Sequence, residues 1–157
     1  MVRKLALVAA PHRQRGLVCR ARDQFSISPL FRRASAYCDR SFAEWYILSA
    51  RHPVPILPNQ VIGPGVCSLH ALEADARMEW ANHIAQWLNT QTAKSSDPIQ
   101  WTLFASQRYA DLLCRASPDV MIELPLLGLR LGERVRWFDE RLHVSQRILH
   151  HTSDGAP

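Results

Sequence analysis

Short apolar runs alternate with longer amphipathic segments along the chain. Apolar or branched stretches at residues 2–10, 45–50, 99–105 and 119–124 predict four buried strands. Segments 29–39, 68–92, 107–115 and 133–150 predict helices, of which 68–92 has the clearest 3.6-residue period. Ser28 before Pro29 is typical of a helix N-terminus. This alternation of strands and helices predicts an α/β fold.

The order of these elements also predicts how they pack. Strands separated by helices need crossover connections, which are right-handed and give a parallel sheet covered on both faces. We therefore expect a three-layer α/β/α sandwich with a four-stranded parallel sheet. The 157 residues suit one hydrophobic core, so residues 1–151 are predicted to form a single domain with a frayed tail at 152–157.

Residues 51–67 form a segment of unusual composition. Pro53, Pro55, Pro58 and Pro64 restrict its backbone and predict an ordered loop with little regular structure. Because a long loop at the carboxyl end of a strand often has a function, we expect this segment to line or gate the site.

Several classes of protein are disfavoured by composition. No apolar run approaches the roughly 20 residues of a membrane span, and Leu5–Ala10 is shorter than a secretory signal core of about 7 to 15, so a cytoplasmic protein is expected. The four cysteines lack a Cys-x-x-Cys pair and are expected to be free thiols. The histidines lack metal-ligand spacing, and no Gly-x-Gly-x-x-Gly or Walker element is present. We expect no metal and no cofactor.

The positive charge is concentrated near the N-terminus. The chain has 17 Arg and only 2 Lys, and residues 1–40 contain nine basic residues against Asp23 and Asp39. Arginine suits phosphate and carboxylate recognition, so this distribution favours a polyanionic partner such as DNA. A high arginine content is also compatible with a GC-rich genome. The residues expected to contact the phosphate backbone are Arg15, Arg20, Arg22, Arg32 and Arg33.

The predicted site lies where the strands end. Ligands of open parallel sheets bind beyond the carboxyl ends of the strands, near the point where strand order reverses. The loops at these ends are polar, although each residue there also fits an ordinary surface or capping role, and Tyr109 also fits a core position. The expected substrate-binding residues are Arg13, Gln14, Ser28, Ser49, Arg51, His52, Ser106, Gln107 and Tyr109.

Three blocks of residues resemble a known family. They are Ala21-Arg22-Asp23 with residues 28–34, Glu44 to His52, and Pro125 to Gly132 leading to Trp137. These blocks resemble small bacterial domains of unknown function related to the peroxide-stress protein YaaA. The resemblance implies nucleic-acid binding and suggests kinship with base-excising enzymes. The chain departs from the family pattern at residues 10–13 and 53–54, and again at 65–66.

The expected fold is also similar in outline to uracil-DNA-glycosylases, an analogy at the level of fold alone. An N-glycosidase needs a carboxylate or polarised water near the sugar and donors for the departing base. We therefore expect a DNA glycosylase that excises a modified base, a role found in anti-phage defence, with Asp23, His12 and Glu123 as candidate catalytic residues. Two alternatives remain open, namely a non-catalytic DNA-binding stress protein and a hydrolase of nucleosides or nucleotides.

Overall fold

The computed structural model describes residues 1–66 and 68–153, with side chains up to His143. Its central sheet contains the strands β1 (Arg3–Ala9), β3 (Glu44–Leu48), β5 (Ile99–Phe104) and β6 (Ile122–Glu123). They are ordered β3-β1-β5-β6, and every neighbouring pair is parallel. The predicted four-stranded parallel sheet is confirmed.

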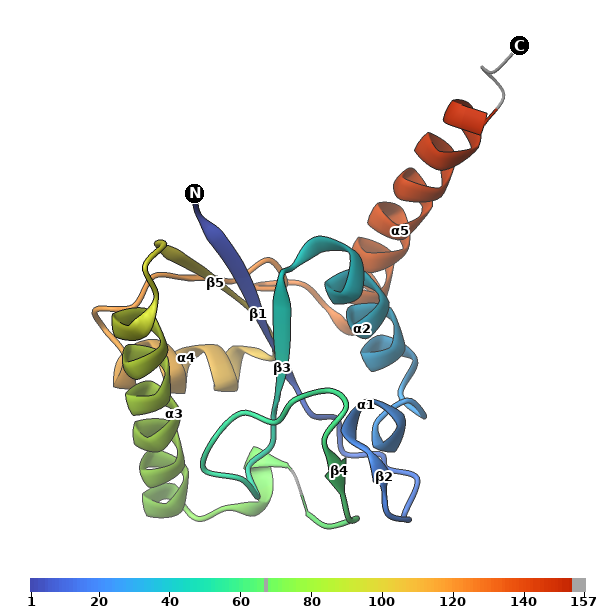
Figure 1. The fold of residues 1–157 in the computed structure, drawn as a ribbon. Coiled ribbons are helices and arrows are strands. Elements are labelled where there is room, and N and C mark those ends of the chain that lie inside the picture. The colour runs from blue at the N-terminus through green and yellow to red at the C-terminus, as the bar shows by residue number, and fades with distance from the viewer. Residues whose placement is uncertain (67, 154–157) are drawn as a thin grey trace.

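Two helical layers cover this sheet. The helices α2 (Pro29–Ser41) and α5 (Leu131–Ser153) pack together on one face, and α3 (Ala74–Lys94) and α4 (Gln107–Ala116) lie on the other (Figure 1). This arrangement confirms the α/β class and the three-layer sandwich. The C-terminal part of α5 extends beyond the sheet (Figure 1). Residues 152 and 153, expected in the frayed tail, belong to α5, and residues 154–157 lie outside the described part of the chain.

The core consists of one apolar layer on each side of the sheet. β1 supplies both, because alternate side chains of a strand point to opposite faces. Ala6 and Val8 pack with the α2 and α5 side, and Leu5 and Leu7 pack with the α3 and α4 side. A strand buried on both faces explains the continuous apolar run by which it was predicted.

A small ribbon at the carboxyl end of the sheet was not predicted. Strand β2 (Cys19–Arg20) pairs antiparallel with β4 (Val61–Ile62), and the short helix α1 (Ala21–Gln24) follows β2 directly (Figure 1). Backbone bonds from Ala21 N to Gln60 O and from Arg22 N to Pro58 O join the proline-rich segment to α1. Residues 51–66 thus contain a strand, β4, where the sequence predicted little regular structure.

Other boundaries also differ from the sequence prediction. The 3-10 helix η1 (Leu69–Ala71) precedes α3, which begins at Ala74 rather than near residue 68. Strand β6 has two residues instead of six. No helix in the described part of the chain is long and apolar enough to cross a membrane.

Candidate ligand-binding site

A cavity of about 300 Å³ lies at the point where strand order reverses. The chain leads from β1 to β3 on one side and from β5 to β6 on the other, so the connections that leave β1 and β5 diverge. Residues 8–12 and 104–106, which end these two strands, form the cavity walls. Ligand sites of open parallel sheets occupy this position.

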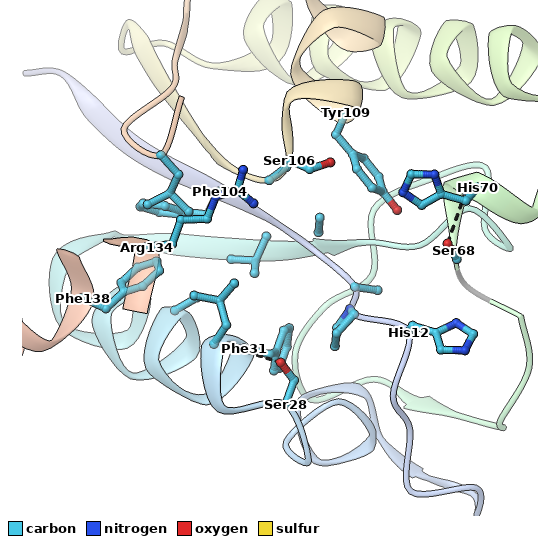
Figure 2. Close-up of a pocket in the computed structure, with 18 residues that line it drawn as sticks. His12, Ser28, Phe31, Ser68, His70, Phe104, Ser106, Tyr109, Arg134 and Phe138 are labelled. Carbon is cyan, nitrogen blue, oxygen red and sulfur yellow. Dashed lines mark hydrogen bonds between the residues drawn. The ribbon is translucent and has the colours of Figure 1, made fainter. Parts of the chain in front are cut away.

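The inner wall of the cavity is apolar and largely aromatic. Phe31 of α2, Phe104 of β5 and Phe138 of α5 line it, and all three are at most 3% exposed. Figure 2 shows Phe31 and Phe138 on the side of α2 and α5, with Phe104 beside Arg134. Leu30, Ala34 and Leu126 complete this wall, which is therefore suited to a flat apolar ring.

Two helix N-termini meet at the cavity. Ser28 is the N-cap of α2, and its hydroxyl accepts a bond from Phe31 N at 3.2 Å. Ser106 occupies the same position in α4, but its side chain makes no capping bond. A helix N-terminus favours a negatively charged or electron-rich group, and the hydroxyl of Ser106 adds a donor that capping does not use.

The charged residues that line the cavity are basic. Arg134 of α5 is half-buried, and its Nε donates to Leu129 O at 3.0 Å. Arg108 Nη1 donates to His70 Nδ1 at 2.6 Å, since a guanidinium has no acceptor. His12 is exposed at the rim. Among the described residues that line the cavity, none is Asp or Glu.

The cavity brings together four of the residues expected from the sequence, namely His12, Ser28, Ser106 and Tyr109. Figure 2 shows Tyr109 and His70 on one side and Ser28 on the other. Sequence reasoning missed Ser68, His70 and Arg134. The first two follow the proline-rich loop, so a search extended past residue 67 would have found them. Arg134 reaches the cavity through the packing of α5 on α2, for which the sequence carries no local signal.

The two carboxylates proposed for catalysis lie elsewhere. Asp23 is in α1 and pairs with Arg20, with a distance of 2.8 Å between Oδ2 and Nε. Glu123 is in β6, where it accepts a bond from Gln100 and lines a separate cavity of about 230 Å³. Neither lines the cavity at the switch point, so catalytic roles for Asp23 and Glu123 stay predictions without support from its geometry.

Three residues after β3 hold the proline-rich loop rather than lining the cavity. Ser49 is 1% exposed, and its hydroxyl lies 3.3 Å from His52 Nδ1. Burial, aided by the charge of Arg51, lowers the pKa of His52 below 6.5. Arg51 donates to Gly63 O at 3.0 Å and to Pro64 O at 2.8 Å. None of residues 51–66 lines the cavity, so the expected gating by this loop is not supported.

The remaining predicted ligand contacts are dispersed. The side-chain amide of Gln14 donates to Gly65 O and accepts from Gly65 N, which joins the loop after β1 to the proline-rich loop. Gln107 donates to Asp111 Oδ1 at 2.6 Å and faces a different groove. Arg13 lies in an apolar groove of about 400 Å³ that shares His12 and other lining residues with the cavity.

Most of the arginines expected to contact phosphates already have partners. Arg20, Arg22 and Arg33 form ion pairs with Asp23, Asp39 and Asp139 respectively. Arg32 donates to the backbone carbonyl of Ser26 at 2.8 Å. Among the described residues, the side chain of Arg15 forms no hydrogen bond or ion pair, but its backbone N–H donates to Gln24 O. These ion pairs reduce the positive electrostatic potential that the sequence predicted for residues 1–40.

The chain thus has a doubly wound α/β fold with a basic, aromatic cavity at its switch point, which is the candidate ligand site. The chain belongs to a family of unknown function, DUF6884, whose model matches residues 5–140. This agrees with the expected membership of a family of unknown function. No curated protein and no solved structure is significantly similar to the chain.

Proposed function

We propose that the cavity binds a single nucleobase of DNA, extruded from its stack, and that the protein hydrolyses the N-glycosidic bond of that base. The observation that carries this proposal is the combination of aromatic walls with hydrogen-bond donors in a cavity of about 300 Å³. This volume is at the lower end of small-molecule sites, about 300 to 1,000 Å³, and suits one ring system. A base must therefore leave its stack to enter, at a cost of a few kcal/mol.

The charge of the cavity suits the departing base. Hydrolysis leaves electron density on the ring, and donors that stabilise it lower the barrier. The guanidinium of Arg134, the hydroxyl of Ser106 and the N-terminus of α4 are such donors at the cavity wall. His12 lies at the rim, where an imidazole can take a proton from water. The adjoining groove beside Arg13 provides space for the sugar.

A second candidate function, base binding without cleavage, is favoured by one observation. None of the described lining residues is a carboxylate that would stabilise a cationic sugar or orient water. Kinship with YaaA, suggested by the sequence resemblance, would agree with this second function.

Base release separates the two candidates. DNAs containing normal and modified bases are incubated with the protein, and free base and alkali-labile abasic sites are measured. The test variant is Ser106→Leu, whose larger side chain should fill the cavity without removing a capping bond. Release by the wild type that is abolished in the variant supports a glycosylase. Affinity that depends on the base, without release of free base, supports the second function. The absence of both base release and base-dependent binding would refute the proposal.

The same assay tests Asp23. Its carboxylate pairs with Arg20 outside the cavity, so Asp23→Asn is expected to leave base release within about twofold of the wild type. A loss of about a hundredfold or more, typical for removal of acid or base assistance, would return Asp23 to the catalytic site.

A further inference from the structure

A second basic surface lies between α3 and α4. It is a groove of about 590 Å³ to which Arg77 contributes from α3, and Arg108 and Arg115 contribute from α4. Asp111 is its one acidic lining residue, and it accepts the bond from Gln107. The groove therefore carries a positive charge.

These three arginines differ from those near the N-terminus in their partners. None of them takes part in an ion pair among the described residues. Arg77 Nε is buried and has no hydrogen-bond partner within the described part of the chain. Arg108 donates to His70 Nδ1, and this partner is not a carboxylate that would compensate its charge. A guanidinium without an acidic partner can bind phosphate without first breaking an ion pair.

The groove adjoins the cavity through the first turn of α4. Ser106 and Tyr109 line the cavity, whereas Gln107 and Arg108 line the groove. Arg108 also contacts His70, which lines the cavity. Arg115 follows Arg108 by two turns, a distance of about 10 Å along the helix. A strand that leaves the cavity past His70 would thus meet guanidinium groups in succession.

We propose that the groove of Arg77, Arg108 and Arg115 binds the phosphodiester backbone of the DNA strand whose base occupies the cavity. This inference rests on the proposed function and names where the strand lies. It places the phosphate contacts on α3 and α4, instead of on the ion-paired arginines near the N-terminus.

Salt-dependent binding tests this placement. Fluorescence anisotropy measures the affinity of a short single-stranded DNA oligonucleotide and of the same oligonucleotide with an abasic site. The test variant is Arg108→Gln/Arg115→Gln, whose residues are exposed on α4. The control is Arg20→Gln/Arg22→Gln, which removes the same charge from two ion-paired arginines. Far-UV circular dichroism confirms that both variants are folded.

We expect the α4 variant to bind both oligonucleotides about tenfold more weakly at low salt. The slope of log affinity against log salt should become less steep by about 1.4, because two phosphate contacts are lost and each contributes about 0.7 for single strands. The control should change affinity less than twofold and leave the slope unchanged. Equal losses in the two variants, or no loss in the α4 variant, would overturn the inference.

The abasic oligonucleotide separates this inference from the proposed function. If the α4 variant binds both oligonucleotides more weakly, but the wild type binds the two equally well, then the groove binds the backbone and the proposal of base binding in the cavity is wrong. If the α4 variant loses affinity only for the intact oligonucleotide, the backbone assignment is wrong, because both oligonucleotides carry the same phosphates.

Discussion

Trp80 supports the wall of the cavity, and its replacement gives the sharpest test of the packing. Its indole Nε1 donates to Ser49 O at 3.0 Å and to His52 O at 2.9 Å, which joins α3 to the end of β3. Its ring also packs edge-on against Tyr109, with 5.7 Å between centroids. Trp80→Phe removes the donor but keeps an aromatic ring in place.

The expected loss of stability follows from the two carbonyl groups that accept the indole bond. Ser49 O keeps a second bond from His52 N, whereas His52 O has no other partner among the described residues. A buried acceptor left without a partner costs about 1 to 3 kcal/mol, and because the bond to His52 O is part-buried, the cost here should lie toward the lower end of that range. At about 2 to 4 °C per kcal/mol for a chain of this size, the variant should melt several degrees lower.

Trp87→Phe is the matched control on the same helix. Trp87 packs against Tyr46 and Trp101, but its indole nitrogen makes no hydrogen bond within the described part of the chain. Urea unfolding, followed by far-UV circular dichroism, should show a larger loss for Trp80→Phe by about 1 to 3 kcal/mol. Equal losses, or a larger loss for Trp87→Phe, would refute the role assigned to the indole bonds.

Three further predictions concern capping, pH and thiol reactivity. Ser28→Ala should lower the unfolding free energy by about 1 kcal/mol because it removes a capping bond, whereas Ser106→Ala should not, as urea titration would show. Because the folded state lowers the pKa of His52, the unfolded state binds more protons below pH 6.5, so stability should fall as pH decreases through that value. His52→Asn should flatten this dependence, and an unchanged pH profile would contradict it. Burial raises the pKa of the Cys38 thiol, so a thiol reagent should modify exposed Cys114 in the folded protein and Cys38 only after unfolding, as peptide mass mapping can show.

Periodicity predicted the elements that carry strong local signals. The run in β1 and the Ser28-Pro29 pair were sufficient for a strand and a helix start that the structure confirms. The ribbon of β2 and β4 left no such signal, because each strand has two residues and about 40 residues separate the pair. The helical period at residues 68–73 led to a wrong prediction that α3 begins there, because η1 at these residues is a separate turn.

The site was predictable only where backbone topology determines it. His12 lies three residues after the end of β1 and Ser106 two residues after the end of β5, so their place at the carboxyl end of the sheet follows from the fold. Asp23 was predicted to be catalytic from its charge in a basic loop, but in the structure it pairs with its neighbour Arg20. Arg134 depends on how α5 packs against α2, a contact between segments about 100 residues apart.

The measurement that tests the central claim most directly is the affinity for a base compared with its absence. Trinucleotides with a normal or modified central base are compared with the same molecule carrying an abasic centre. We predict that at least one base improves affinity by about tenfold or more. Arg134→Met should remove this gain, because Arg134 lines the cavity, whereas Arg136→Met, at an exposed position on the same helix, should retain it. Equal affinity for all intact and abasic trinucleotides would contradict a base-binding cavity.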